Sequence, residues 1–284
     1  MTDPHSSDGE SAPTAESDAE RPPGWTRVLA YNVRYELGDV EPRSWERRRD
    51  AVAETILQQD PDLVALQEVW RGQLGDLQER LPGYEWVVPK DGEEHAAIAY
   101  RSGRYSLVES GSRWLSEPET APGVPGWDSD YQKRFVYSTL HDEHTDTAVV
   151  LFSVHLPFTG ERAPREAMLL VREAVTDVGT DLPVVVAGDF NTSPGEVVYE
   201  LANQHREPFR DLQYASDLAD SVEGPELTFT GFPGDGEDAC NIDHVLVTPD
   251  VSVVRTATVV PESETAEFKP SDHRPIVADV LLTE

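Results

Sequence analysis

The sequence predicts an α/β (α+β) fold in which two packed β-sheets are flanked by helices, and three observations lead to it. Strand-like apolar runs outnumber helical stretches along the chain. Short hairpin-like connections join most of these runs, and strand and helix do not alternate regularly. The length of 284 residues suits one large domain plus a tail, and a hydrophobic content of 38% provides a core.

The first segment of the chain differs from the rest in composition. Residues 1–24 are rich in Ser, Asp, Glu, Pro and Ala, and contain no apolar residue larger than the initiator Met. Such a segment buries too little surface to offset the cost of ordering, so we expect an acidic disordered tail over 1–24 and one domain over 25–284. The start of the chain has no signal-peptide pattern, and no apolar run approaches the roughly 18 residues that span a bilayer.

The elements of the domain follow in order. A strand is predicted over 27–35, and Ser44 can cap a helix over 45–59 that turns Val52, Ile56 and Leu57 inward. Further helices are predicted over 71–80, along the apolar face of 167–178, and near 196–204. Strand-like runs occupy residues 62–69, 84–88, 96–101, 105–114, 135–141, 147–155, 183–187, 227–229, 242–247, 251–260 and 276–282.

The charge of the chain is strongly negative. Lys+Arg amounts to 23 residues against 54 Asp+Glu, which gives a net charge of -31 and a pI of about 4.4. The lysines are Lys90, Lys133 and Lys269, and the other basic residues are arginines. At molar salt the screening length falls to about 3 Å, which removes most of the self-repulsion of such a surface. The composition therefore favours adaptation to a salt-rich cytoplasm over an ordinary acidic protein.

The charge also bears on partners. Binding to nucleic-acid phosphates needs Lys/Arg patches, and the one basic cluster, residues 43–49, has helical spacing. Nucleic acid is therefore not favoured as a partner, although a local basic groove stays open. The single cysteine, Cys240, excludes an intrachain disulfide and a Cys-rich zinc site. We expect a cytoplasmic monomer without membrane association.

Polar residues at strand ends carry the functional signal. Asp189 and Asn191 follow a β-branched run and are spaced by two, which puts both side chains on one side of an extended backbone. This pair can hold a hard cation and orient a water or a phosphate, or it can be a simple turn. Comparable positions are Asn32, Gln67-Glu68, His155, Asp243-His244 and Ser271-Asp272-His273. Singly each has a structural alternative, but their joint occurrence is hard to ascribe to chance.

In this order of motifs the chain resembles the endonuclease/exonuclease/phosphatase superfamily, the fold of pancreatic deoxyribonuclease, over about residues 25–284. The resemblance implies a four-layer α/β sandwich with the site at one mouth and a divalent cation, Mg²⁺ or alternatively Mn²⁺. A less characterised bacterial, archaeal and fungal branch is similar in residues 114–118 (Trp-Leu-Ser-Glu-Pro), 126–128 (Gly-Trp-Asp) and Arg134. Related members often carry Asp where this chain has Pro157, so substrate choice shifts here.

The resemblance also implies roles. Glu68 suits the metal as a hard oxygen ligand, with Asn32 orienting it or ligating beside it, and Asp272 binds metal or fixes its neighbour. Asp189 is then the base or aligner for the attacking water, and Asn191 holds the phosphate.

Two histidines complete the implied site. His273 donates to a nonbridging oxygen, and Asp243 orients His155 and keeps it protonated, since a close carboxylate raises an imidazole pKa. For substrate contacts the resemblance points to Arg134 and Glu94, and Trp127 is either a substrate wall or hydrophobic packing.

Three function classes follow. The first is a magnesium-dependent hydrolase of small phosphate esters or phosphodiesters, in which metal, base and donors meet the charge of the reacting phosphate. The second is a nuclease that uses the same site on DNA or RNA. The third, a noncatalytic binding protein, is disfavoured because all the polar motifs are present.

Overall fold

The computed structural model describes residues 24–37, 39–90, 94–117, 124–179, 181–236 and 238–282, with the side chains at 94 and 95 excepted. Apart from Gly24, the predicted tail over 1–24 lies outside the described residues. Within the described part, no helix combines the length and the apolar character that a membrane span requires.

Two mixed β-sheets form the centre of the domain. Among the described residues, seven strands form the first sheet, in the spatial order β10 (Ser221–Glu223), β12 (Val251–Thr258), β13 (Ile276–Leu282), β1 (Trp25–Asn32), β2 (Leu63–Trp70), β4 (Glu94–Arg101) and β3 (Tyr84–Val87). Six described strands form the second, in the order β5 (Tyr105–Trp114), β6 (Arg134–Asp142), β7 (Thr147–His155), β8 (Val184–Asp189), β11 (Asp243–Val247) and β9 (Gln213–Tyr214). The pairs β1–β2, β10–β12 and β7–β8 are parallel, and the other neighbours are antiparallel.

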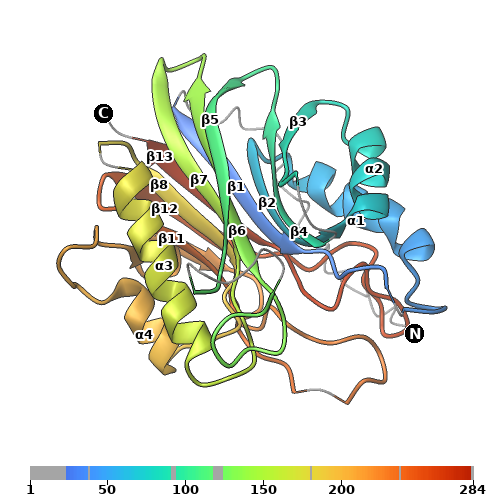
Figure 1. Ribbon diagram of the computed structural model, residues 1–284. Helices are drawn as coiled ribbons and strands as arrows, with labels where there is room; N and C mark the ends of the chain where they lie inside the picture. Colours follow the sequence, from blue (N-terminus) through green and yellow to red (C-terminus); the bar gives the residue numbers. More distant parts are fainter. Residues whose placement is uncertain are drawn as a thin grey trace, which may run out of the picture.

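Helices cover the outer faces of both sheets (Figure 1). The helices α1 (Trp45–Gln59) and α2 (Arg71–Arg80) pack on the first sheet, and α3 (Ala163–Val178) and α4 (Val197–Asn203) pack on the second. A short helix, α5 (Ala215–Leu218), lies near β11 and β12. Layers of helix, sheet, sheet and helix confirm the four-layer sandwich that the sequence predicted.

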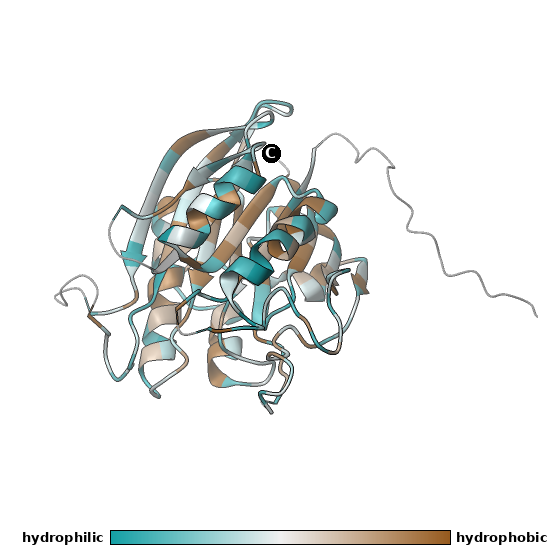
Figure 2. Cartoon of the chain, turned by 90° about the vertical axis from the view of Figure 1, so that its right-hand side faces the viewer, coloured by the Kyte–Doolittle hydropathy of each residue, from teal (hydrophilic) through white to brown (hydrophobic). Residues whose placement is uncertain are grey.

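Three apolar layers separate the four layers of structure. Val28 and Val185 belong to the core between the sheets, whereas Leu29 belongs to the core beneath α1. Neighbouring residues of β1 thus point to opposite faces, and because both faces are covered, the central strands are apolar throughout. Figure 2 shows the apolar strands behind helices that are largely hydrophilic on the side facing the viewer.

Most predicted elements occur close to their expected bounds, and the deviations are local. Leu57 is 48% exposed, so its expected inward position is wrong, because it lies about 100° around the helix from the buried Ile56. Ser44 precedes α1, but its hydroxyl donates to Glu41 Oε1 (3.0 Å) and accepts no capping hydrogen bond from the helix amides. The strand expected at 227–229 is reduced to isolated bridges of Phe229, and β9, β10 and α5 were not predicted.

The pairing of the strands brings the predicted polar residues to one end of the sandwich. Asn32 lies beside Gln67 at the ends of β1 and β2, and His155 lies beside Asp189 at the ends of β7 and β8. Asp243 begins β11 directly opposite Asp189. We refer to this end of the sandwich as the mouth.

Candidate active site

Gly188 sets the position of the central carboxylate. It has a φ of 148°, and a Cβ atom at this position would lie 2.0 Å from the carbonyl oxygen of Val154. Only glycine therefore lets β7 and β8 approach this closely. The approach places Asp189 next to His155, where Asp189 is 2% exposed and accepts a hydrogen bond from the Asn191 amide (2.9 Å).

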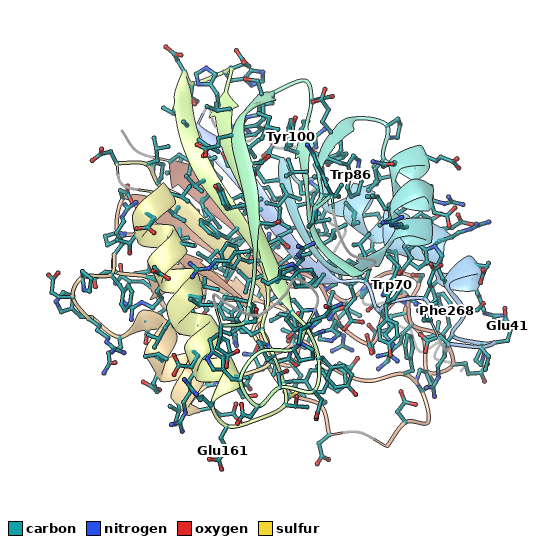
Figure 3. The ribbon with its side chains drawn as sticks, in the orientation of Figure 1. Glu41, Trp70, Trp86, Tyr100, Glu161 and Phe268 are labelled. Atoms are coloured by element: carbon teal, nitrogen blue, oxygen red, sulfur yellow. The ribbon has the colours of Figure 1, made fainter. Side chains whose placement is uncertain are left out.

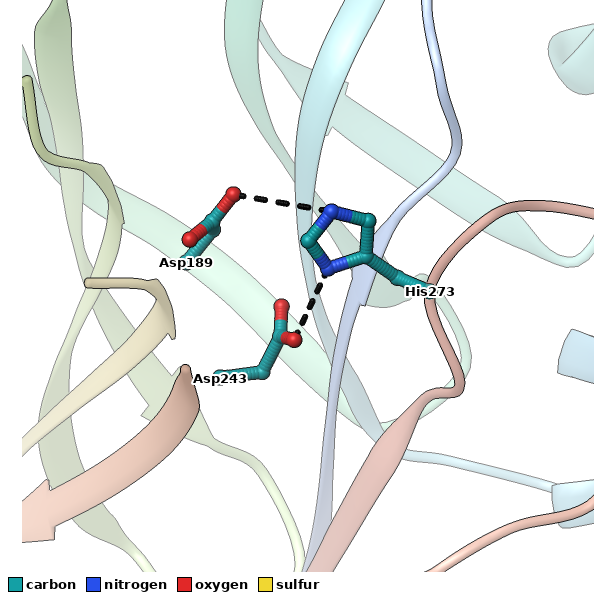
Figure 4. Close-up of side chains that lie close together, drawn as sticks. All are labelled: Asp189, Asp243 and His273. Atoms are coloured by element: carbon teal, nitrogen blue, oxygen red, sulfur yellow. Dashed lines mark hydrogen bonds and ion pairs between the residues drawn. The ribbon is translucent and has the colours of Figure 1, made fainter. Parts of the chain in front are cut away.

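Asp243 pairs with His273, not with His155. The distance from His273 Nδ1 to Asp243 Oδ2 is 2.8 Å, and His273 Nε2 lies 3.8 Å from Asp189 Oδ2 (Figure 4). The expected pairing of Asp243 with His155 is therefore wrong. Its physical reason is the fold: the segment before β13 brings His273, and not the end of β7, against the first residue of β11.

Burial and neighbouring charges shift the pKa values of His273 and Asp189. Burial lowers the pKa of His273, but the adjacent Asp243 and the nearby Asp189 and Asp272 outweigh it and raise that pKa to about 10. Burial and the charge of Asp243 raise the pKa of Asp189 to about 7. His273 is thus the charged imidazole, and Asp189 titrates near neutral pH.

His155 is a neutral imidazole. Burial, then the charges of Lys133 and His273, hold its pKa well below the usual value, so the expectation of a protonated His155 is wrong. The Lys133 ammonium lies 3.2 Å from Nδ1 of His155 and donates to it, which leaves the proton of the ring on Nε2. That nitrogen faces Asp189 Oδ2 at 3.4 Å and Glu68 Oε1 at 3.9 Å.

Glu68 occupies a distorted position near the end of β2. Its φ is 62°, and the pairing of β2 with β4 shifts register between Leu66 and Val69. This irregularity turns Glu68 toward the mouth, where its Oε2 accepts from the Tyr35 amide (3.0 Å). The side chain is 12% exposed, so one carboxylate oxygen reaches the opening of the site.

Asn32 links the two carboxylates. Its Nδ2 donates to Asp189 Oδ2 (3.0 Å) and lies 3.3 Å from Glu68 Oε1, while its Oδ1 accepts from the amide of Arg34 (3.0 Å). These contacts favour the orienting role over the ligating role for Asn32. Asn191 has a φ of 48° and donates from Nδ2 to the carbonyl of Leu156 (2.9 Å), which holds its amide next to the end of β7.

Asp272 completes the acidic cluster from the loop before β13. It is 7% exposed, lies 3.7 Å from Arg34 Nη1, and accepts from the Ser271 hydroxyl at 3.2 Å. Burial raises the pKa of Asp272; the charge of His273 opposes this rise, and the charge of Glu68 adds to it.

These donors fit a divalent cation. Glu68 and Asp272 offer hard carboxylate oxygens, the ligand type that Mg²⁺ selects. A second arrangement exists, since one ligand atom each from Asp189, Asp243 and His273 lie within 4.8 Å of one another. In that arrangement Nδ1 of His273 is bonded to Asp243, so only its Nε2 could face an ion. Glu68 and Asp272 are the other carboxylates of the mouth that could hold a cation, and the charge of Glu68 acts on Asp272.

The adjoining ends of β5 and β6 build one wall of the site. The guanidinium of Arg134, which is 4% exposed, lies 3.8 Å from the centre of the Trp114 ring. Both side chains line a small pocket together with Lys133, Gln132, Ala96 and His155. The structure thus places Arg134 in one small pocket with His155.

Residues of the two motifs at 114–118 and 126–128 contact each other and the start of α3. Glu117 accepts from the Trp127 amide (2.8 Å), and Asp128 accepts from the Arg162 and Ala163 amides at the start of α3. Trp127 packs against the apolar layer beneath α3 and is not among the described residues that line the Arg134 pocket, which favours its packing role. Glu94 begins β4 opposite Trp70, and its side chain lies outside the described part.

Some residues at the mouth were not anticipated. Lys133 was not among the predicted site residues, although it is one of few lysines and adjoins Arg134. Arg48 is fully buried in α1 and donates to the carbonyls of Val33 (2.9 Å) and Pro270 (2.8 Å), which ties the loops carrying Asn32 and Asp272 together. In the sequence it is indistinguishable from its solvated neighbours.

Comparison with known proteins places this geometry in a family. The model of the Endonuclease/Exonuclease/phosphatase family matches residues 29–273. An endonuclease/exonuclease/phosphatase from Bacteroides vulgatus is 30% identical, with coverage of 91% of this chain and 99% of that one and a TM-score of 0.84. The mannosyl-6-phosphatase of Bacteroides thetaiotaomicron is 28% identical, with coverage of 90% and 99% and a TM-score of 0.80. Human nocturnin is 26% identical over 91% of this chain, but the match spans only 65% of nocturnin. The chain belongs to the endonuclease/exonuclease/phosphatase family of phosphoester hydrolases.

Proposed function

We propose that this protein is a Mg²⁺-dependent hydrolase of phosphate esters that acts by in-line attack of water. The observation that carries the proposal is the buried Asp189, which contacts Asn32 and His155 and lies opposite the charged His273. A carboxylate whose pKa is about 7 accepts a proton at neutral pH more readily than an ordinary Asp, as a general base for water requires.

The surrounding residues have complementary tasks. Glu68 and Asp272 would hold the cation, which when bound supplies neutralisation of the phosphate charge. Asn32 fixes the relative positions of Asp189 and Glu68. Nε2 of the charged His273 and the neutral Nε2–H of His155 donate to phosphate oxygens, where they stabilise the charge of the transition state.

Two observations support a small phosphate monoester as substrate. Lys133 and Arg134 add positive charge beside His155, which suits the extra negative charge of a terminal phosphate. One similar protein, at 28% identity over nearly its full length, is a mannosyl-6-phosphatase. The basic cluster at 43–49 lends no support to a nuclease, since Arg43, Arg47 and Arg49 form ion pairs with Asp235, Glu41 and Asp76, and Arg48 is buried.

A substrate panel tests this proposal. The protein is incubated in molar KCl and about 5 to 10 mM MgCl₂ with one substrate at a time. The substrates are hexose phosphates, nucleoside monophosphates, phosphodiesters, and single-stranded DNA and RNA. We expect release of inorganic phosphate from at least one monoester, with loss of activity in EDTA and recovery on addition of Mg²⁺. Cleavage of nucleic acid alone, or turnover that persists in EDTA, would contradict the proposal.

We also propose that the protein works in a salt-rich cytoplasm. The support is the net charge of -31 together with the scarcity of surface lysine: Lys133 is buried at His155, and half-buried Lys269 donates to Thr230 and Gly231. Added salt screens the repulsion between carboxylates, and this screening is strong at molar concentrations. The thermal midpoint of unfolding should therefore rise between dilute buffer and about 2 M KCl. A midpoint that stays constant or falls in differential scanning calorimetry would contradict the proposal.

A further inference from the structure

Two exposed aromatic side chains stand at the mouth. Tyr131 is 52% exposed and Phe158 is 53% exposed, and among the described residues they are the aromatic side chains with at least half of their surface in solvent. Their rings stack on each other, with centroids 5.0 Å apart and planes inclined by 24°. Exposed aromatics in contact form an apolar surface that solvation disfavours, which is typical of a binding site.

The two loops that carry this pair are locked to each other. Thr159 Oγ1 accepts from the amide of Asp130 (2.9 Å), and Ser129 Oγ donates to the carbonyl of Tyr131 (2.8 Å). Asp128 accepts from the amide of Glu161 (2.9 Å), which belongs to the loop at the lower rim in Figure 3. The aromatic pair is therefore held in one arrangement before any ligand arrives, which lowers the entropic cost of binding.

The pair lies directly beside the catalytic cluster. The Lys133 ammonium is 3.2 Å from His155 Nδ1 and 5.7 Å from the centre of the Phe158 ring, so a single ammonium separates the ring from the catalytic imidazole. Phe158 follows His155 by three residues, and Tyr131 precedes Lys133 by two. A phosphate held at His155 would have the rest of its ester within reach of the pair.

We propose that Tyr131 and Phe158 form the subsite for a ring in the alcohol part of the substrate. The inference rests on the proposed function and narrows it to phosphate esters whose alcohol carries a flat or pyranose ring close to the phosphate. Such a ring offers an apolar face that stacks on an aromatic side chain, while an acyclic alcohol has no such face. The subsite therefore selects the alcohol, and the catalytic cluster selects the phosphate.

Two nonhydrolysable probes test the subsite without turnover. Phenylphosphonate carries a ring and methylphosphonate does not, and their binding is measured by calorimetry with MgCl₂ present. We expect the wild type to bind phenylphosphonate about five- to tenfold more tightly, as one stacking contact supplies. In Phe158→Ala and Tyr131→Ala this preference should largely disappear, with little change in methylphosphonate binding.

Val108→Ala is the matched control. Val108 is 65% exposed on β5, six residues before Trp114, and thus about 20 Å along the strand from the mouth. Truncating it removes a comparable exposed apolar side chain and should leave both affinities unchanged. Phe158→Leu keeps apolar bulk without a ring face and should lose most of the preference, which separates stacking from general burial.

Turnover identifies the source of the ring. The kcat/KM of Phe158→Ala relative to wild type is compared for a hexose 6-phosphate, a nucleoside 5′-phosphate and glycerol phosphate. A loss of about five- to tenfold for either ring substrate, with glycerol phosphate within about twofold, supports the subsite and names the ring.

The outcomes separate the two proposals. Equal binding of both phosphonates by the wild type, or an unchanged preference in Phe158→Ala, overturns the subsite and leaves the hydrolase intact. Failure of the wild type to bind either phosphonate or to hydrolyse any phosphate ester overturns the proposed function and this inference with it. Self-association of the wild type that Phe158→Ala abolishes, without a change in ring preference, would assign the pair to contact between copies and also overturns the subsite.

Discussion

The two ends of the sandwich both bury charge, but they neutralise it differently. At the end opposite the mouth, Arg104 lies 2.6 Å from Asp142 and 3.2 Å from Asp62, and Arg27 lies 2.6 Å from Asp279. Burial raises the pKa of Asp142, but hydrogen bonds from Arg104 and the His144 amide outweigh it and hold that pKa below its usual value.

At the mouth the balance is reversed. Burial raises the pKa values of Asp189 and Asp272; the charge of His273 opposes the rise, and the neighbouring carboxylates of Asp243 and Glu68 add to it. The far end is thus satisfied by its own arginines, whereas the mouth has acidic groups that a cation from solution would stabilise. Buried carboxylates are typical of structure where their own ion pairs lower the pKa, and are candidates for function where burial and like charges raise it.

The largest expected effect comes from removing negative charge at the mouth. Glu68→Gln keeps the shape of the side chain but weakens its bond to a hard cation, so kcat/KM should fall about 10³-fold or more because several kcal/mol of transition-state stabilisation are lost. The thermal midpoint should not fall. The measurement is a Mg²⁺ titration of activity beside a melting curve, with exposed Glu109→Gln as the control. Wild-type activity at saturating Mg²⁺ would remove Glu68 from the metal site.

The opposite result is expected at the far end. Arg104→Met leaves Asp142 and Asp62 buried without their shared guanidinium, which should lower the free energy of unfolding by about 3–5 kcal/mol. Activity per folded molecule should stay the same. Because the pKa of Asp142 lies below that of an unfolded Asp, about 3.9, the wild type loses this stabilisation as the pH falls below about 4, and the variant, which keeps only the other hydrogen bonds to Asp142, has less to lose.

Denaturant unfolding at two pH values checks this prediction. Arg113→Met is the matched control, since Arg113 and Glu173 form an ion pair between exposed side chains and should contribute less than about 1 kcal/mol. A stable Arg104→Met variant with lost activity would show that the comparison between the two ends is mistaken.

A smaller loss of rate is expected from the pair that joins the second sheet to the loop before β13. Asp243→Asn and His273→Asn should each lower kcat by about 10²-fold, and the double variant should lose little more, because the two side chains act through one hydrogen bond. Combining Asp243→Asn with His155→Asn should instead multiply the two losses. Steady-state kinetics checks this. Losses that multiply for Asp243 with His273, but not for Asp243 with His155, would show that Asp243 acts together with His155.

This pairing shows where sequence reasoning reaches its limit. The order of polar residues and the apolar strands between them predict the four layers, and parallel neighbours such as His155 and Asp189 are expected to meet at strand ends. Which imidazole reaches Asp243 depends on how a loop of the first sheet lies across the second, and no local pattern encodes that contact. Likewise, the burial of Arg48 follows from the loops around it and not from its own helix.

The smallest expected effect at the mouth concerns Lys133, a positioning residue in the site. Its ammonium donates to Nδ1 of His155 and so keeps the ring proton on Nε2, which faces Asp189. Lys133→Met removes the ammonium that donates to Nδ1, so the ring proton of His155 can move from Nε2 to Nδ1. Part of the molecules then lack the Nε2–H donor toward the phosphate. We expect kcat to fall about tenfold, the lower end of the range for one positioned donor.

Nitrogen-15 chemical shifts of His155 provide a readout that a merely structural role would not change. In the wild type they should report a neutral ring protonated at Nε2, and in Lys133→Met a mixture of both neutral forms, whereas Lys133→Arg retains a donor and should recover part of the rate. Lys90→Met, at an exposed lysine, should change neither the shifts nor kcat. Lys133→Met could instead lower kcat while the tautomer of His155 stays the same. In that case Lys133 would act on the substrate directly through its positive charge, as Arg134 does, and would not position the imidazole.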